Sequence, residues 1–220
     1  QIENSFAARE RSEDRMRQFV ADASHELRTP LATVRGYAEL YRQGAIPTAD
    51  ALDTAMGRIE SEAARMSGLV EDLLTLARLD ETPDLAVAPL DLTVLAADAV
   101  ADAQVREPER QITLQPLDGR LGPVHALADE AALRQVLINL LGNAVRHTPE
   151  RSPIEVAVGY LDDMAVLEVR DHGPGIPRAE AGKVFQRFYR SDPSRGRTGG
   201  GGNGLGLAIV SALVTHRGGR

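Results

Sequence analysis

Two successive stretches of this 220-residue chain place apolar residues at alternating spacings of three and four, the pattern of a helix with one buried stripe. The first runs from Ser5 to about Gln43, and the second follows an interruption at 44–47 that Thr48 or Asp50 can cap. The stripes comprise Val20, Ala23, Leu27, Pro30, Val34, Tyr37 and Tyr41, and then Leu52, Met56, Ile59, Ala63, Met66, Val70, Leu73 and Ala77. Together they predict an antiparallel helical hairpin over residues 1–80.

A lone hairpin of this length would leave much of its apolar stripe in water. Pairing with a second copy into a four-helix bundle is the natural way to bury that surface. The sequence therefore predicts that the chain is an obligate homodimer, held together by these two helices.

A different pattern follows a proline-containing linker at residues 81–89. Leu90 to Ala103 reads as a helix, 111–115 as a strand, and Asp129 can cap a helix through about Val145. Residues 154–160 and 165–170 alternate as paired strands around an Asp162–Asp163 turn, and a glycine-rich loop at 199–204 leads into a helix from Leu205 to about Val214. This order predicts an α/β two-layer sandwich over 90–220, with helices on one face of a mixed sheet.

Composition excludes several classes of function. A net charge of −7 argues against direct nucleic-acid binding, which needs a clustered basic face. The absence of cysteine excludes disulfides and thiolate metal sites. No apolar run has the length of a membrane span, and no signal peptide is visible.

The segment "SHELRTP" at 24–30 interrupts the first helical pattern with polar residues and a proline. His25 falls away from the predicted stripe, and Thr29 lies one turn later on the same outward face. Pro30 cannot donate to the carbonyl of Glu26, so we expect a bend beside the histidine. An exposed surface histidine beside a tolerated kink is the alternative interpretation.

This segment resembles the phosphoacceptor box of sensor histidine kinases of the HisKA type. The resemblance implies that the neutral imidazole of His25 is the nucleophile that accepts a phosphoryl group. It also implies that Glu26 takes or holds the other proton of the ring, and that Thr29 orients water in a reverse, phosphatase reaction.

A second segment, "LRQVLINLLGNAVRHTP" at 133–149, resembles the N box of the same family. The resemblance makes Asn143 the ligand of Mg²⁺ and Asn139 a second polar contact, because an amide oxygen suits a hard cation that bridges phosphates. Arg146 is expected to reach phosphate and His147 to lie beside the nucleotide. The alternative for each asparagine is a hydrogen bond on the helix face.

Three further segments resemble ATP-binding boxes of the GHKL superfamily, whose nucleotide domain is the Bergerat fold. In "DHGPGIP" at 171–177, similar to the G1 box, Asp171 would accept from the adenine amino group, and the glycines let the backbone approach the base. In "VFQRFYR" at 184–190, similar to the F box, Phe185 and Phe188 would anchor the ATP lid. In "GGNGLGLA" at 201–208, similar to the G2 box, amides at a helix start would hold phosphate oxygens. The residues assigned to nucleotide binding in these boxes are Asp171, Gly173, Gly175, Ile176, Phe188, Gly202, Gly204, Leu205 and Gly206.

These boxes are identified as those of the cytoplasmic kinase core of a bacterial sensor histidine kinase, which uses ATP and Mg²⁺ to phosphorylate His25. The resemblance implies that the phosphoryl group then passes to an aspartate on the receiver domain of a response regulator. In relatives the sheet continues beyond residue 220, and sensor and membrane-spanning regions precede the core, so we expect the last strands and an upstream membrane region to be missing here. The alternatives are a dimeric scaffold that binds nucleotide without chemistry, and an ATPase of the chaperone or mismatch-repair kind.

Overall fold

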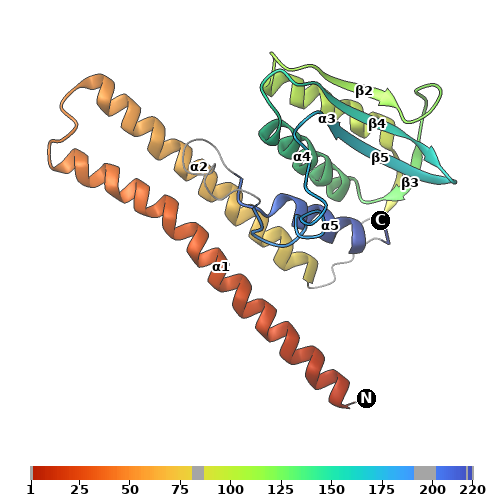
Figure 1. The fold of residues 1–220 in the computed structure, drawn as a ribbon, viewed down its shortest axis with the longest axis horizontal. Coiled ribbons are helices and arrows are strands. Elements are labelled where there is room, and N and C mark those ends of the chain that lie inside the picture. The colour runs from red at the N-terminus through yellow and green to blue at the C-terminus, as the bar shows by residue number, and fades with distance from the viewer. Residues whose placement is uncertain (1, 81–86, 191–201, 217, 220) are drawn as a thin grey trace. The chain divides into compact units, whose positions relative to one another are not determined.

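A computed structural model describes residues 2–80, 87–190, 202–216 and 218–219 of the chain. The chain divides into two units, Gln1–Thr75 and Leu76–Arg220. Figure 1 shows a pair of long helices and an α/β sandwich. Residues 81–86 of the predicted linker, and Gly199 to Gly201 of the predicted glycine-rich loop, lie outside the described residues.

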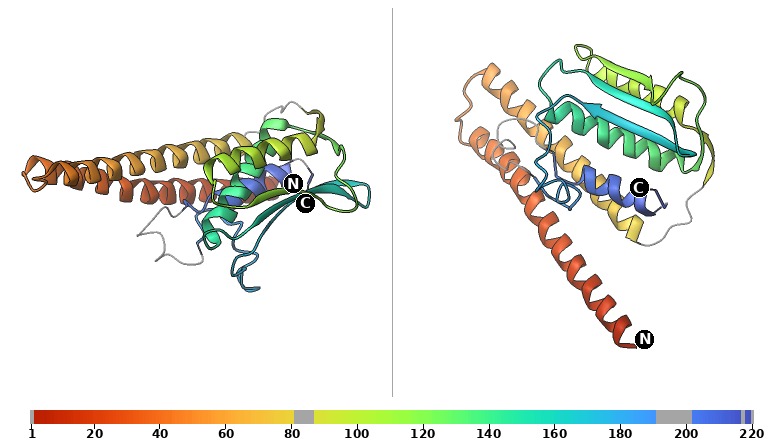
Figure 2. Two further views of the ribbon diagram at one scale, coloured as in Figure 1. Left: turned by 90° about the horizontal axis from the view of Figure 1, so that it is seen from above. Right: turned by 45° about the vertical axis from the view of Figure 1, so that its right-hand side comes forward.

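Helices α1 (Ile2–Arg42) and α2 (Ala49–Asp80) form the predicted hairpin and run antiparallel, side by side (Figures 1 and 2). Gly44 makes the turn with a φ of 69°, a conformation that glycine adopts without steric cost. The Thr48 hydroxyl accepts a hydrogen bond from Ala51 N at 3.2 Å and so caps α2. The predicted hairpin is confirmed. Helix α1 also continues without a break through Pro30, which is fully buried.

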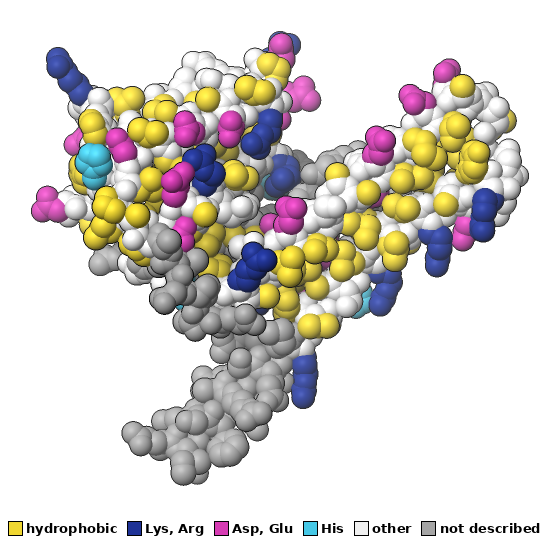
Figure 3. All heavy atoms as spheres, turned by 180° about the vertical axis from the view of Figure 1, so that it is seen from behind, with side chains coloured by type: hydrophobic (Ala, Val, Ile, Leu, Met, Phe, Trp, Pro, Cys, Tyr) yellow, Lys and Arg dark blue, Asp and Glu magenta, His cyan; other side chains and the backbone are white. Residues whose placement is uncertain are grey.

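The buried stripe of α2 is displaced from the predicted one by one position along the chain. Ala55 and Leu69 are buried, whereas their neighbours Met56 and Val70, which the pattern placed in the stripe, are 42% and 43% exposed. The reason is that a single partner helix covers only one flank of a stripe. Figure 3 shows hydrophobic side chains along the exposed face of the helices. The large apolar residues exposed on the hairpin are Val20, Leu31, Leu40, Tyr41, Met56, Val70 and Leu74.

In the second unit, the described strands form two sheets. Strands β2 (Ile112–Pro116), β4 (Ile154–Leu161) and β5 (Met164–Asp171) form a sheet in the order β2-β4-β5, parallel in the first pair and antiparallel in the second. The mixed sheet is confirmed. Asp162 and Asp163 turn between β4 and β5 with positive φ angles. Strands β1 (Ala88–Asp91) and β3 (His125–Ala128) pair separately, and the sequence did not predict them.

In the described part of this unit, helices follow the linker at α3 (Leu92–Arg106), α4 (Glu130–His147) and α5 (Gly206–His216). Figures 1 and 2 show α3 and α4 covering one face of the three-stranded sheet. The Asp129 carboxylate caps α4 by accepting from Ala132 N at 3.0 Å, as predicted. The core between sheet and helices includes Leu95, Ile112, Leu137, Leu141, Ile154, Val156 and Val158. Burial of each large side chain there contributes about 1.5–3 kcal/mol, which holds α3 and α4 against the sheet.

None of the helices in the described part of the chain combines the length and the apolar content needed to cross a bilayer.

Candidate functional site

The histidine segment lies in the middle of α1 with His25 exposed to solvent. Thr29, one turn later, is exposed on the same face. Glu26 instead extends toward α2, where its Oε2 lies 3.7 Å from Nη2 of Arg65. A macromolecule or a nucleotide could therefore reach His25 and Thr29 together, while the neighbouring carboxylate is held between the two helices.

In the second unit, the two asparagines of the predicted N box lie one turn apart on α4, and both are partly buried. Oδ1 of Asn139 accepts from Nε2 of Gln135 at 3.4 Å, but Nδ2 of Asn139 is buried without a hydrogen-bond partner. A Cβ atom added to Gly206 would lie 3.8 Å from Oδ1 of Asn139. The start of α5 therefore lies against this face of α4, beside a buried amide whose donor is unsatisfied.

The loop before α5 also meets the end of α4. A Cβ added to Gly202 would lie 2.8 Å from Nη1 of Arg146, so the loop passes directly against this guanidinium, which would have to shift to admit a larger residue. Arg146 and His147 both lie in the last turn of α4 and are exposed. The fold thus brings the predicted N box and G2 box together.

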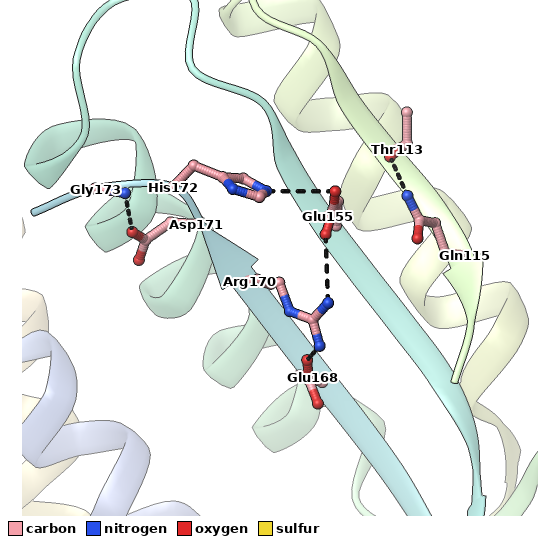
Figure 4. A network of polar contacts seen from close by, with 8 residues as sticks. All are labelled: Thr113, Gln115, Glu155, Glu168, Arg170, Asp171, His172 and Gly173. Atoms are coloured by element: carbon pink, nitrogen blue, oxygen red, sulfur yellow. Dashed lines mark hydrogen bonds and ion pairs between the residues drawn. The ribbon is translucent and has the colours of Figure 1, made fainter. Parts of the chain in front are cut away.

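The predicted G1 segment begins at the last residue of β5. Oδ1 of Asp171 accepts from Gly173 N at 2.8 Å, which fixes the carboxylate at the strand end (Figure 4). A Cβ on Gly173 would lie 3.1 Å from Cγ2 of Thr148 and 3.2 Å from the carbonyl of His147. The segment therefore packs closely on the end of α4. Gly175 follows with a φ of 75°, and Ile176 is 51% exposed.

Charged side chains on the neighbouring strands flank Asp171 (Figure 4). Arg170 pairs with Glu168 of its own strand at 2.7 Å and lies 3.9 Å from Glu155 of β4. Nε2 of His172 lies 3.4 Å from the same Glu155. Each exposed pair contributes little to stability, but together they connect β4 and β5 next to Asp171.

The predicted F box lies against the loop before α5. Phe188 N donates to the Gly204 carbonyl at 2.9 Å, and Phe188 and Gly204 both have positive φ angles. Phe188 is partly buried, whereas Phe185, the other predicted anchor, is 48% exposed. Leu205 is fully buried at the start of α5. Partial burial, together with the nearby Glu180 carboxylate, raises the pKa of Tyr189 above its usual value.

This packing predicts that Gly204→Ala destabilises the second unit. A Cβ there would lie 2.9 Å from the Phe188 carbonyl carbon and 2.9 Å from the Tyr189 carbonyl oxygen, and φ is +68°. We expect a loss of about 1–3 kcal/mol in unfolding free energy, together with weaker ATP binding. Thermal unfolding and nucleotide titration measure both. Gly182→Ala is the matched control, because a Cβ there meets nothing within 4 Å. Equal stability of the two variants would contradict the prediction.

Sequence reasoning missed two residues that support this site, Arg110 and Gln135. Arg110 is buried and donates to the Thr148 hydroxyl at 2.5 Å, and that hydroxyl donates to the Ala144 carbonyl at 2.7 Å. This chain of hydrogen bonds fixes the end of α4 that Gly173 contacts. Gln135, which holds Asn139, was detectable from its spacing of one helical turn.

A groove of about 360 Å³ lies between α3 and α4. Of the residues predicted to bind nucleotide, only Arg146 lines it. Neither asparagine of the predicted N box does. We place the candidate nucleotide site at the other side of α4, where the glycine loops and Asp171 converge, because that is where the polar groups lie. Residues 191–201, between the F and G2 boxes, lie outside the described residues.

The residues present fit ATP and a magnesium ion. The unsatisfied amide of Asn139 and the guanidinium of Arg146, which lies against the loop at Gly202, suit a phosphate chain with hydrogen-bond acceptors. Asn143 offers a neutral oxygen of the type that Mg²⁺ binds. Among the described residues no group of three His, Asp or Glu side chains could hold a metal without help. A magnesium ion would therefore depend on phosphate oxygens as well as on Asn143.

Two family models match the chain. Residues 15–82 match the His Kinase A (phospho-acceptor) domain, and residues 128–220 match the histidine kinase-, DNA gyrase B- and HSP90-like ATPase. The protein described as the probable sensor histidine kinase TcrY of Mycobacterium tuberculosis is 49% identical over 219 residues, which are 99% of this chain and 45% of that protein. The chain thus spans less than half the length of this relative.

Solved structures show the same similarity. A mycobacterial sensor histidine kinase, MprB, is 30% identical with a TM-score of 0.51, covering 60% of this chain and 81% of that one. The histidine kinase AdeS of Acinetobacter baumannii is 25% identical with a TM-score of 0.65, covering 87% of this chain and 86% of that one. The second match extends over most of both chains, so it includes helical hairpin and sandwich alike.

Proposed function

The chain belongs to the sensor histidine kinase family, and we propose that it is the kinase core of such a protein, transferring the γ-phosphoryl group of ATP to His25. The single observation that carries the proposal is the exposure of His25 on α1, one turn before an exposed Thr29. That placement suits a nucleophile that must meet a nucleotide bound to another part of the protein.

In the proposed reaction, His25 attacks with the lone pair of one ring nitrogen. A nitrogen–phosphorus bond forms, the bond from the γ-phosphorus to the bridging oxygen breaks, and ADP leaves with that electron pair. The proton on the second ring nitrogen passes to the Glu26 carboxylate and then to water. Positioning and charge stabilisation supply most of the rate, because phosphoryl transfer needs little covalent help from the protein.

The second unit would bind the nucleotide. Asp171 would accept from the adenine amino group, Arg146 would contact phosphate, and Asn139 would donate its unsatisfied amide. Bound Mg²⁺ would offset phosphate charge, with Asn143 as its protein ligand. The remaining contacts would come from His147, Gly173, Gly175, Ile176, Phe188, Gly202, Gly204, Leu205 and Gly206.

Two partners and a location complete the proposal. Exposed apolar residues along the hairpin support a homodimer with a four-helix bundle, since a second hairpin would cover them. The receiver domain of a response regulator would take the phosphoryl group from His25 onto an aspartate, and the same face would later support phosphatase activity. The core would work on the cytoplasmic side of a bacterial membrane, connected to it by a region outside this sequence.

The proposal is tested by incubating the protein with Mg²⁺ and ATP labelled at the γ-phosphate. Label that stays on the protein and then moves to a receiver domain supports it. Nucleotide binding without protein labelling would favour a signalling scaffold, and release of labelled inorganic phosphate alone would favour an ATPase.

Variants of Thr29 and Glu26 should separate phosphorylation of His25 from dephosphorylation of the regulator. Thr29→Ala is expected to keep His25 labelling roughly intact but slow dephosphorylation of the regulator about 10- to 100-fold, because a water-orienting hydroxyl is lost. Glu26→Ala is expected to slow labelling and spare dephosphorylation. Both rates are measured on each variant, as autophosphorylation and as decay of purified phospho-regulator. Equal losses of both rates in Thr29→Ala would mean that the residue only supports the helix before Pro30.

A further inference from the structure

Arg65 lies on α2 with its guanidinium between two carboxylates. Nη2 is 3.7 Å from Oε2 of Glu26 on α1, and Nη1 is 3.4 Å from Oε2 of Glu62, which lies one turn earlier on α2. The two ends of the guanidinium thus hold residues of different helices. Glu62 steadies Arg65, and Arg65 reaches across to the residue that follows His25.

This cluster is partly withdrawn from water. The side chains of Arg65 and Glu62 are each 24% exposed and that of Glu26 is 31% exposed. Nε of Arg65 is buried and has no hydrogen-bond partner. Exposed ion pairs contribute little, but the attraction rises as the surroundings become less polar. A buried, unsatisfied nitrogen also costs stability, so packing alone is a poor explanation for an arginine at this position.

The cluster bears on His25 through its neighbour. Glu26 is the carboxylate proposed to accept the ring proton. A flexible, exposed glutamate would often adopt rotamers that point away from the ring. Anchoring it from the second helix restricts its rotamers.

We propose that Arg65 is a positioning residue for phosphorylation of His25: it acts through Glu26, orienting that carboxylate from the other helix of the hairpin. This inference rests on the proposed kinase function. It predicts that Arg65 matters for the forward transfer to histidine but not for the water-dependent reaction assigned to Thr29, which does not use Glu26.

The first test compares Arg65→Met with the unaltered protein. We expect autophosphorylation at saturating ATP to slow about 10-fold with the KM for ATP unchanged, because the nucleotide residues are on the second unit. Dephosphorylation of the regulator should keep its rate. Arg65→Lys should recover part of the loss, since lysine keeps the charge but cannot contact two carboxylates as a planar fork. Arg58→Met is the matched control, an exposed arginine two turns earlier on α2. It should be fully active.

The second test combines Arg65→Met with Glu26→Ala. If Arg65 acts through Glu26, the double variant is no slower than Glu26→Ala alone. A purely structural role would slow both backgrounds by the same factor and would reduce both reactions. Circular dichroism verifies that each variant is helical, and Arg65→Gln replaces Arg65→Met if the latter loses helicity.

The outcomes separate this inference from the function on which it rests. If the unaltered protein is never labelled, the kinase proposal fails, and the inference falls with it. If the unaltered protein is labelled and Arg65→Met is labelled at the same rate, the inference alone is overturned. The same holds if the double variant is slower than Glu26→Ala by the factor that Arg65→Met shows by itself. The inference is supported if Arg65→Met slows autophosphorylation but keeps the rate of regulator dephosphorylation, and if the double variant is no slower than Glu26→Ala.

Discussion

Replacing His25 by glutamine is expected to abolish labelling of the protein by Mg-ATP. Glutamine keeps a polar, helix-compatible side chain but has no nucleophilic nitrogen, because its amide lone pair is delocalised. His25 is exposed on α1, so the change should leave the hairpin folded. The measurement is the amount of γ-phosphate retained on purified protein over time, with helicity checked on the same preparation.

The matched control for this variant is His125→Gln. His125 is also an exposed histidine, but it lies on β3 and has no assigned part in the reaction. It should be labelled as fast as the unaltered protein. Label that persists in the His25 variant, in a preparation free of contaminating kinases, would remove His25 from the mechanism.

The second large effect is expected at the nucleotide site. Asn143→Ala and Asp171→Ala should each reduce labelling by about 100-fold or more, because each removes a polar group placed for metal or adenine. Both variants should remain folded and dimeric, since the hairpin and not this site would hold the dimer. Limiting and saturating ATP distinguish the two variants. Excess ATP should partly restore the labelling of Asp171→Ala, because that variant loses affinity for ATP. It should restore the labelling of Asn143→Ala less, since the metal ligand is absent.

Asp102→Ala serves as the control for the aspartate, since Asp102 is exposed on α3 and is not assigned to nucleotide binding. Gel filtration and circular dichroism report the oligomeric state and the fold of all three variants. Normal labelling of either site variant, at both ATP concentrations, would show that the ATP site is misplaced.

The sequence was most informative where local periodicity and local chemistry agree. The alternation of apolar residues predicted both long helices, and Asp129 and the Asp162–Asp163 turn fixed the ends of α4 and β4. The pattern missed β1 and β3 because each is only four residues long and neither sequence alternates between polar and apolar residues. It also placed Leu90 in a helix, whereas Leu90 lies in β1 and α3 begins at Leu92.

Contacts between segments distant in sequence could not be predicted from the boxes alone. The resemblance named Asn139, Asp171 and Gly204 separately. The fold adds that Gly206 lies beside Asn139, that Gly173 packs on Thr148, and that the Gly204 carbonyl accepts from Phe188. The pair of Arg65 with Glu26 is of the same kind, because it depends on the register of two helices joined by a turn.

The central claim is that ATP phosphorylates an imidazole nitrogen at residue 25, and the chemical stability of the label tests it most directly. After reaction with Mg-ATP, the protein is divided and treated with acid or alkali, and the labelled fragment is identified by mass spectrometry. A phosphoramidate is acid-labile and alkali-stable, so we expect acid to remove the label, alkali to retain it, and the modified fragment to carry the group on His25. Two hydroxyl residues, Ser24 and Thr29, lie close by on the same helix. An acid-stable phosphate on either of them would contradict the account.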